Sequence, residues 1–390
     1  MRILFVAPNI PIPGSHGGST HVTEVVRALR RRHEVLALVR RGSREPGAAA
    51  IGLGTAEGFW AYVLALVHFP AAYLAARRFR PDVIYERFSA HGLGVLLGKA
   101  LGVPVVSMVL DARVTRWTLR GADRLIATAP QLVPQAYHHK LVEVSWGANT
   151  DLFRPDLDGT PVRRKLGIER DEFIFGYTGG FYPWHGLETL IEAIRRLADD
   201  PAARRTRVVL VGDGPNRAVI ESRIDAAGLR SRFLSVGRVP YDEVPHYVAA
   251  FDACVAPYDP AHPELRGEGT FFRDPLKVFE YLASGKPTIT LDSDNIRKMF
   301  RHGEHALLVP PGDPVALADA MTSLLGRPDR GRALGEEGRR LVTTRFTWQA
   351  HADRLTELFE ALVGKLSGSG SGTPVPSQIP PPSRSSPRHS

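Results

Sequence analysis

The stretch TFFRDPLKVFEYLASGKPTITL, residues 270–291, contains a complete helix-to-strand unit. Pro275 suits the start of a helix, where its missing N–H is not needed, and Gly285 is typical of a helix end. Pro287 then precedes the short apolar run 288–291, which has the β-branched composition of a strand. The pattern predicts a helix over 276–283 and a buried strand directly after it.

Short apolar runs alternate with helix-patterned segments along most of the chain. Strands are predicted at 3–7, 35–39, 82–85, 103–110, 124–127, 141–144, 173–177, 208–211, 233–236, 253–256, 288–291 and 306–309. Helices are predicted at 20–32, 58–79, 91–101, 130–139, 187–197, 216–227, 241–250, 276–283, 314–325 and 329–343. Strands that are apolar on both faces and separated by helices indicate an α/β fold with parallel, doubly wound sheets.

The length of the chain indicates two domains. Its 390 residues exceed the roughly 250–300 at which one hydrophobic core stops growing. We expect a first domain over 1–155, a linker over 156–170 and a second domain over 171–345. Ligands of open α/β sheets bind beyond the carboxyl ends of the strands, so the site is expected in the cleft between the domains. Residues 366–390 alternate Ser and Gly and then carry six prolines, which predicts a disordered tail.

The composition is that of an ordinary globular protein, with 43% hydrophobic and 23% charged residues. A single cysteine, Cys254, excludes an internal disulfide framework and suits a reducing cytoplasm. The longest apolar segment, 61–76, is interrupted by His68 and Pro70 and is shorter than the about 20 apolar residues of a membrane span. With no secretory signal visible, the expected location is cytoplasmic.

The positive charge is concentrated in the first half of the chain. Residues 1–150 hold 18 Lys and Arg against 9 Asp and Glu, which accounts for the whole net charge of +9. Such a field attracts phosphorylated substrates, an anionic membrane surface or nucleic acid, unless the arginines merely solvate helix faces. No nucleic-acid recognition motif or aromatic platform is present, so a nucleic-acid partner is not expected.

The predicted helix 58–79 has a wide apolar face and ends near Arg77, Arg78 and Arg80. Apolar surface beside clustered arginines suits a peripheral contact with an anionic membrane, here its inner face. Packing on the sheet is the alternative, which the interruptions at His68 and Pro70 favour. Both interpretations stay open at this point.

Two glycine-containing turns follow predicted strands. Gly17 and Gly18 precede a helix, and free N–H groups at a helix N-terminus bind phosphate well. Taken alone, such a glycine pair is as often a plain turn as a phosphate site. The second turn, GDGPNR at 212–217, has Arg217 where a dinucleotide fingerprint requires a third glycine. We interpret this second turn as a tight turn, with Pro215 in the first turn of the following helix.

Lys277 and Glu280 lie on one face of the predicted helix 276–283. A lysine in the first turn opposes the helix dipole, and a bound diphosphate would explain its presence there. Glu280, three residues on, is placed to accept two hydrogen bonds from the hydroxyl groups of a ribose. The pair predicts a nucleotide site.

The chain resembles the GT-B-fold retaining glycosyltransferases of glycosyltransferase family 4 over nearly all of residues 1–362. The resemblance rests on the Gly17-Gly18 loop and on a series of segments in the family's order. These are WGANTDLFRP (146–155, similar to the family's NGVDxxxFxP), YTGGFYPWHG (177–186), VGDGP (211–215), FRDPLKVFEYLASGKP (272–287) and FTW (346–348).

This resemblance implies two Rossmann-like domains that face a cleft, and a C-terminal helix over 346–365 that crosses back to the first domain. It implies a hexosyltransferase that uses a UDP-, GDP- or TDP-sugar as co-substrate, retains the anomeric configuration and needs neither a metal nor a further cofactor. The acceptor is expected to be a small molecule or secondary metabolite, or a glycan or lipid-linked intermediate.

The resemblance also assigns residues to the site. The implied catalytic residues are Glu280, Lys277 and His185. The implied nucleotide-sugar contacts are Gly17, Gly18, Gly180, Val239, Arg273, Lys277 and Glu280. The pair Asp292 and Asp294 is similar to the metal-binding DxD of another glycosyltransferase class, but no third ligand accompanies it, so no metal site is expected.

Three departures from the family pattern are visible. Phe272 stands in place of the first glutamate of the family's E-x7-E motif. His185 replaces the lysine of the donor loop, and the arginine expected before it is missing, so Lys277, Arg273 or a protonated His185 must face the diphosphate. The histidine-bearing segment of the first domain is YERF at 85–88. Two alternatives remain: a catalytically degenerate binding or regulatory subunit, and a nucleotide-sugar 2-epimerase.

Overall fold

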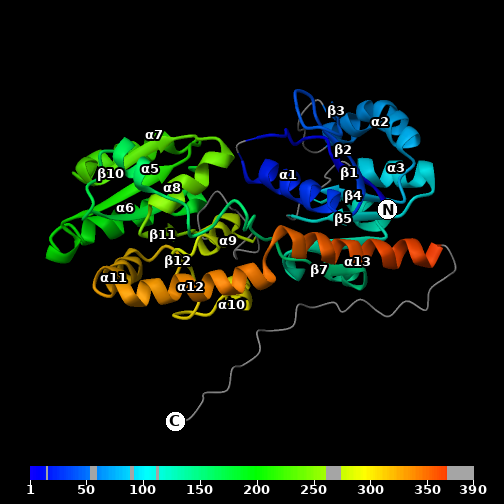
Figure 1. Cartoon of the computed structure of the whole chain (residues 1–390). Coiled ribbons are helices and arrows are strands. Elements are labelled where there is room, and N and C mark those ends of the chain that lie inside the picture. The colour runs from blue at the N-terminus through cyan, green and yellow to red at the C-terminus, as the bar shows by residue number, and fades with distance from the viewer. Residues whose placement is uncertain (15, 53–58, 88–91, 111–113, 261–273, 367–390) are drawn as a thin grey trace, which may run out of the picture.

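The computed structural model describes residues 1–366 apart from 15, 53–58, 88–91, 111–113 and 261–273. Figure 1 shows two α/β domains side by side, with the last two helices, α12 and α13, running along the lower edge of both. Each domain is built on one parallel sheet. The predicted α/β class with two Rossmann-like domains is confirmed.

The sheet of the first domain has seven parallel strands in the order β3-β2-β1-β4-β5-β6-β7. The strands are β1 Arg2–Ala7, β2 Glu34–Arg40, β3 Ala48–Gly52, β4 Val83–Arg87, β5 Val105–Met108, β6 Arg124–Ala127 and β7 Leu141–Glu143. The helices are α1 Gly17–Arg30, α2 Phe59–Phe79, α3 Leu93–Leu101 and α4 Arg116–Gly121. The reversal of strand order at β1 is the doubly wound pattern, so the carboxyl ends of β1 and β4 border the crevice.

The sheet of the second domain has six parallel strands in the order β10-β9-β8-β11-β12-β13. The strands are β8 Phe173–Thr178, β9 Thr206–Val211, β10 Phe233–Gly237, β11 Ala253–Ala256, β12 Thr288–Leu291 and β13 Leu307–Val309. The helices are α6 Leu187–Arg196, α7 Arg217–Ala226, α8 Val244–Ala250, α9 Leu276–Ala283, α10 Asp294–Met299, α11 Pro314–Leu325 and α12 Pro328–Arg345.

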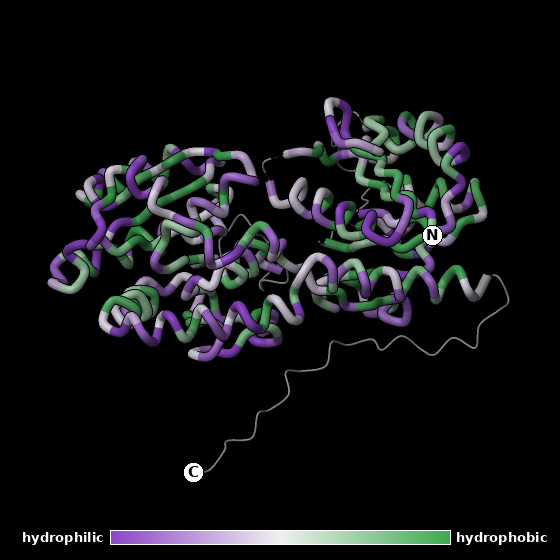
Figure 2. Tube along the Cα trace, viewed as in Figure 1, coloured by the Kyte–Doolittle hydropathy of each residue, from purple (hydrophilic) through white to green (hydrophobic). Residues whose placement is uncertain are grey.

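Alternation along each strand divides the core between the two faces of the sheet. In β1, Ile3 and Phe5 pack with residues of α1 and α13, whereas Leu4 and Val6 pack with residues of α2 and α3. The green strands inside the molecule in Figure 2 reflect this burial on both faces. Cys254 lies in β11 and is completely buried, where burial raises the pKa of its thiol.

The C-terminal helix α13, Trp348–Leu366, packs against α1 of the first domain. The side chain of Asp353 accepts a 3.1 Å hydrogen bond from Arg32, and the Thr356 hydroxyl lies 2.9 Å from Nε2 of His33. These contacts join the last described helix to the first domain. Residues 367–390, predicted as a disordered tail, lie outside the described residues.

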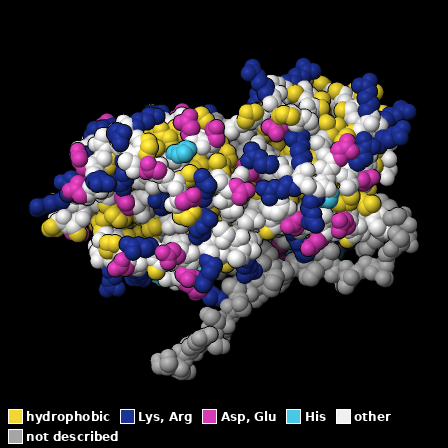
Figure 3. Space-filling view, viewed as in Figure 1, with side chains coloured by type: hydrophobic (Ala, Val, Ile, Leu, Met, Phe, Trp, Pro, Cys, Tyr) yellow, Lys and Arg dark blue, Asp and Glu magenta, His cyan; other side chains and the backbone are white. Residues whose placement is uncertain are grey.

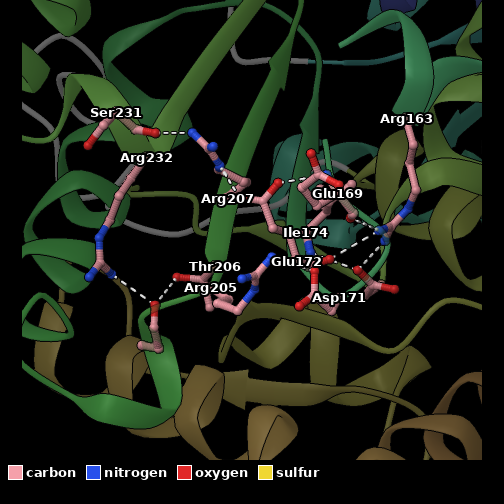
Figure 4. Close-up of polar contacts among 12 residues, drawn as sticks. Arg163, Glu169, Asp171, Glu172, Ile174, Arg205, Thr206, Arg207, Ser231 and Arg232 are labelled. Atoms are coloured by element: carbon pink, nitrogen blue, oxygen red, sulfur yellow. Dashed lines mark hydrogen bonds and ion pairs between the residues drawn. The ribbon is translucent and has the colours of Figure 1, made fainter. Parts of the chain in front are cut away.

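The segment predicted as a linker contains a helix, α5 Thr160–Lys165. Arg163 of α5 donates to the carbonyl oxygen of Ala250 at 3.0 Å and forms an ion pair with Asp252. It also donates to the carbonyl oxygen of Glu172 at 3.0 Å (Figure 4). A Cβ on Gly159 would lie 2.4 Å from the Ala250 nitrogen, so only glycine permits this approach. The helix is therefore fixed to the second domain.

Other elements differ from the sequence predictions. The predicted helix 130–139 is wrong: two 3-10 helices, Pro130–Leu132 and Gln135–Lys140, replace it, because Pro134 cannot continue a helix. In the predicted helix 241–250, Tyr241–Glu243 is a 3-10 helix and only α8 is α-helical. The strand β3 escaped prediction because its sequence, AAAIG, has little β-propensity.

One side of α2 carries apolar side chains that face solvent. Trp60, Leu66, Val67 and Leu74 are each more than half exposed, and Trp60, Val67 and Leu74 are seven residues apart, which places them on one helix face. Exposed Arg77 and Arg78 continue the helix beyond them. In Figure 3, yellow and dark-blue side chains gather on the upper right, over α2. No helix in the described part of the chain is long and apolar enough to span a membrane.

Candidate functional site

Three glycine-containing loops pack on each other at the carboxyl ends of β8, β9 and β10. Gly179 N donates to Val211 O at 2.9 Å, and Gly212 N donates to Gly237 O at 2.8 Å. A Cβ on Gly212 would lie 1.9 Å from the Gly179 oxygen, so the two loops approach as only glycine allows. Residues 212–217 form the predicted turn, although Pro215 precedes α7 rather than lying in its first turn.

Helix α9 begins after Pro275 and ends at Ala283, as the sequence predicts. Lys277, in its first turn, is 8% exposed, and its Nζ lies 3.9 Å from the centroid of the Tyr177 ring and 5.1 Å from that of Tyr258. Its Nζ has no hydrogen-bond acceptor among the described residues. A Cβ on Gly179 would lie only 2.6 Å from this nitrogen, so the glycine loop makes room for the amine. Burial lowers the pKa of Lys277 well below its usual range.

Glu280 lies one turn further along α9 and is 5% exposed. Tyr241 donates a 3.0 Å hydrogen bond to its Oε1. Burial, helped by the charge of Glu24 of the first domain, raises the pKa of Glu280 to about 8, although the hydrogen bond from Tyr241 and the charge of Lys277 act in the opposite direction. A buried amine and a buried carboxyl group therefore share this face of α9.

The first domain contributes Glu24 of α1 to the surroundings of Glu280. Asn149 donates to Glu24 Oε2 at 2.9 Å, and Arg27 pairs with Oε1 at 2.7 Å. The domains are linked by the 2.7 Å hydrogen bond from Trp146 N to Oδ2 of Asp274, a residue that lies just before α9. Thus the start of α9 is held against the first domain just before the Lys277–Glu280 pair.

His185 is tied into the loop that follows β8. Its Nδ1 lies within hydrogen-bond reach of the Gly180 carbonyl oxygen and 2.9 Å from the hydroxyl of Tyr177. The Tyr258 ring meets the imidazole edge-on at 5.4 Å. Because Nδ1 is engaged in these contacts, a contact of His185 with a substrate has to use Nε2.

In the first domain, Gly17 and Gly18 form the first turn of α1, so this helix begins about one turn earlier than predicted. His16 caps the helix, and its Nδ1 accepts from Ser19 N at 3.2 Å. A Cβ on Gly18 would lie 3.0 Å from the His16 ring and 3.4 Å from Nη2 of Arg87. The imidazole of His16 and the guanidinium of Arg87 therefore both lie beside the Gly17-Gly18 loop.

The remaining sequence candidates lie in different settings. Val239 is half-buried just beyond β10, and Arg273 lies outside the described residues. Asp292 accepts two hydrogen bonds from Arg297, at 2.6 and 2.7 Å, and Asp294 pairs with the same guanidinium. Within the described ranges, no group of three or more His, Cys, Asp or Glu residues is arranged to hold a metal ion.

Tyr241, Glu24 and Arg87 belong to the surroundings of the site but were not predicted. Tyr241 follows β10, Glu24 lies in the middle of α1, and Arg87 ends β4, so they come from three separate elements. The YERF segment of the sequence pointed to the place of Arg87 without giving it a role. For Tyr241 and Glu24 the sequence carries no local signal.

Two family models match the chain, and together they cover both domains. "Glycosyltransferase Family 4" matches residues 15–138, and "Glycosyl transferases group 1" matches residues 172–327. The first match includes α1 and β4, and the second includes the three glycine loops and α9.

Curated relatives have related descriptions. The chain is 28% identical over 263 residues to a 2-deoxystreptamine N-acetyl-D-glucosaminyltransferase of Streptomyces fradiae, over 67% of this chain and 58% of that protein. It is 30% identical over 263 residues to a D-inositol 3-phosphate glycosyltransferase of Geodermatophilus obscurus, over 64% of this chain and 54% of that protein. The chain thus spans little more than half the length of these two relatives.

Among solved structures, the fold is similar to that of a sucrose-phosphate synthase from Thermosynechococcus elongatus. The TM-score is 0.73 at 22% identity, with 94% of this chain and all of that chain covered. The likeness extends across both domains and supports the GT-B architecture.

Proposed function

The chain belongs to glycosyltransferase family 4, and from this membership we propose that it transfers a hexosyl group from a nucleoside-diphosphate sugar to an acceptor hydroxyl group. We further propose that the anomeric configuration is retained and that no metal ion is needed. The observation that carries the proposal is the buried Lys277–Glu280 pair on α9, which faces α1 of the first domain.

Glu280 is the proposed ribose ligand. A carboxylate accepts two hydrogen bonds from adjacent hydroxyl groups, and charge-assisted bonds of this kind are stronger than neutral ones. The bond from Tyr241 fixes one carboxyl oxygen, so the group is oriented before the donor binds. The half-buried Val239, just beyond β10, is proposed to offer its backbone to the nucleotide base.

Lys277 is the proposed cation for the departing diphosphate. Its Nζ is held over the Tyr177 ring and against Gly179, and no acceptor within the described residues takes its hydrogen bonds. A diphosphate would supply both the acceptors and the negative charge that stabilise the ammonium form. Fixed charges aimed at the leaving group are the main electrostatic means of lowering the barrier to transfer.

His185, Gly180 and Gly17-Gly18 complete the proposed donor site, and Arg273 is proposed as a further cation. The acceptor hydroxyl group attacks from the same side that the diphosphate leaves. Closing the two domains around the donor excludes water, which suppresses its hydrolysis.

Metal independence is supported by the pairing of the aspartates that resemble a DxD motif. Asp292 and Asp294 both bind Arg297, so their carboxylates already have a cation. The charge on the leaving diphosphate is then neutralised by side chains such as Lys277.

A small polyhydroxylated molecule is the proposed acceptor. The relatives named for 2-deoxystreptamine and for D-inositol 3-phosphate act, by their names, on compact cyclic polyols. Such an acceptor suits a cytoplasmic enzyme, and the proposed location is the cytoplasm.

The exposed face of α2 favours a second candidate, a lipid-linked acceptor. Trp60, Val67 and Leu74 present apolar surface, and Arg77 and Arg78 add positive charge at the end of the helix. This combination fits the interface of an anionic membrane, where the enzyme would rest peripherally on the inner face.

Incubation of the purified protein with UDP-, GDP- and TDP-sugars tests the proposal. A donor that binds the native state raises the melting temperature by mass action, and the stabilising donor is then offered with polyol and lipid-linked acceptors. We expect acceptor-dependent release of the nucleoside diphosphate, unchanged in EDTA. Conversion of the donor without any acceptor would indicate the 2-epimerase alternative. Donor binding with no turnover on any acceptor would indicate a degenerate binding subunit.

A further inference from the structure

A buried guanidinium lies beside the N-terminus of α1. Arg87 is the last residue of β4 and is 6% exposed. Its Nε donates a 3.2 Å hydrogen bond to Nδ1 of His21. A Cβ on Gly18 would lie 3.4 Å from Nη2 of Arg87. The tip of the side chain therefore points at the glycine loop.

No carboxylate in the described part of the chain balances this charge. Successive side chains of a strand point to opposite faces, and Glu86 accordingly turns away and accepts from Gly94 N at 2.7 Å. His21 is neutral, since burial lowers its pKa well below the usual range. Burial also lowers the pKa of Arg87 to about 10, which still leaves it charged at neutral pH. A buried charge without a counter-ion is costly, so the site favours an anion.

Further positive charge converges on the same loop from both domains. Burial lowers the pKa of His16, the cap of α1, and the nearby charges of Arg87, Arg238 and Arg40 lower it further. Arg238 belongs to the second domain and directly precedes Val239. The 14-residue helix α1 adds its free N–H groups, and no acidic residue occupies its first turn.

A phosphoryl group matches this arrangement best. It carries more than one negative charge, and its oxygens accept the paired N–H groups that a guanidinium presents in one plane. The proposed donor loop of the second domain, residues 179–186, contains His185 and no lysine or arginine, so other side chains must supply charge to a diphosphate.

We infer that Arg87 is a first-domain ligand of the donor diphosphate, which binds one of its phosphoryl oxygens beside Gly18. This inference rests on the proposed function. It makes Arg87 and Lys277, from opposite domains, partners on one diphosphate, so closure of the cleft adds to the stabilisation of the leaving group.

Titration calorimetry with inorganic pyrophosphate tests the inference on the purified full chain. Arg87→Gln should weaken pyrophosphate binding by about tenfold or more, the usual loss for a charge-assisted hydrogen bond. Arg120→Gln, which removes an exposed arginine of α4, is the matched control and should bind as the wild type. Binding by folded Arg87→Gln within a factor of about two of the wild type, the usual scatter of such contributions, would overturn the inference.

Arg87→Lys keeps the charge but loses the planar pair of donors and the bond to His21. We expect it to bind pyrophosphate more weakly than the wild type and, where Arg87→Gln folds, more tightly than that variant. If Arg87→Gln does not fold, an unchanged affinity in Arg87→Lys contradicts the inference. Pyrophosphate binding does not require transfer. A chain that shows this dependence on Arg87 but moves no sugar would therefore refute the proposed function and leave the anion site standing.

Discussion

The hydroxyl group of Tyr241 donates a 3.0 Å hydrogen bond to Oε1 of Glu280. Tyr241 begins the 3-10 helix that follows β10, and Glu280 lies on α9, so the bond joins two elements at the carboxyl edge of the second sheet. Both side chains are largely removed from water, and burial raises the pKa of Tyr241 well above its usual range. The bond thus fixes the carboxyl group from the side of the proposed base-binding strand.

Tyr241→Phe should shift the pH dependence of donor use. Burial raises the pKa of Glu280 to about 8, and the bond from Tyr241 acts in the opposite direction. Without that bond the pKa rises further, so the acidic limb of kcat/KM for the donor should move to higher pH. At pH 7 we expect kcat/KM for the donor to fall by about tenfold, the usual effect of losing one hydrogen bond to a charged group. Tyr247→Phe, in α8, is the control, and an unshifted limb would contradict a role for Tyr241.

Lys277→Met should lower kcat by about 100- to 1,000-fold, the range seen when one charge-stabilising donor is removed from an active site. The methionine side chain keeps most of the apolar stem, and it removes a buried amine that lacks an acceptor among the described residues. Thermal stability should therefore be unchanged or higher. Lys298→Met, on the exposed side of α10, is the control. Wild-type turnover by Lys277→Met would remove Lys277 from the leaving-group site.

Asp274→Asn should make stability less dependent on pH. Burial raises the pKa of Asp274 from 3.8 to about 7, so the folded state holds a proton that the unfolded state releases. The free energy of unfolding contributed by this group then falls as the pH rises from about 4 to about 7, by up to about 4 kcal/mol. Asparagine keeps an oxygen for Trp146 N. The free energy of unfolding, measured with denaturant at pH 5 and at pH 8, should differ less between the two pH values in the variant than in the wild type. An equal difference in both proteins would refute the raised pKa of Asp274.

The apolar face of α2 predicts binding to anionic vesicles at low salt that fades at high salt. Co-sedimentation with phosphatidylglycerol vesicles and with neutral phosphatidylcholine vesicles measures it. A double variant, Val67→Ser with Leu74→Ser, should lose the binding without losing stability, since both side chains face solvent. Val219→Ser, an exposed apolar residue of α7, is the control. If the wild type stays in the supernatant at low salt, membrane binding through α2 is contradicted. The small-molecule acceptor is then the candidate that remains.

The sequence predicted elements well wherever caps mark their ends. Helix α9 has Pro275 before it and Gly285 after it, and both of its predicted bounds are correct. A proline inside a helical pattern led to a wrong prediction. Residues 130–139 have helical spacing, but Pro134 separates them into two 3-10 helices. Helix α5 was hidden in a Pro- and Gly-containing stretch, and its stability comes from contacts of Arg163 with the second domain.

The site was less accessible from the sequence because its surroundings come from distant elements. Lys277 and Glu280 could be paired in advance, since they lie on one face of one helix. The partnership of Tyr241 with Glu280 and the approach of Arg87 to Gly18 depend on how separate strands end at the same edge. Such tertiary neighbours leave no periodic signal in the chain.

Replacement of Glu280 tests the central claim most directly. Glu280→Ala removes the proposed ribose ligand, and the donor that stabilises the wild type in the thermal-shift screen is the substrate to use. The account predicts a loss of turnover by at least about 100-fold with the circular dichroism spectrum preserved, since the lost bonds to two hydroxyl groups are charge-assisted. Turnover of folded Glu280→Ala at the wild-type rate would contradict the assignment of this cleft as the nucleotide-sugar site.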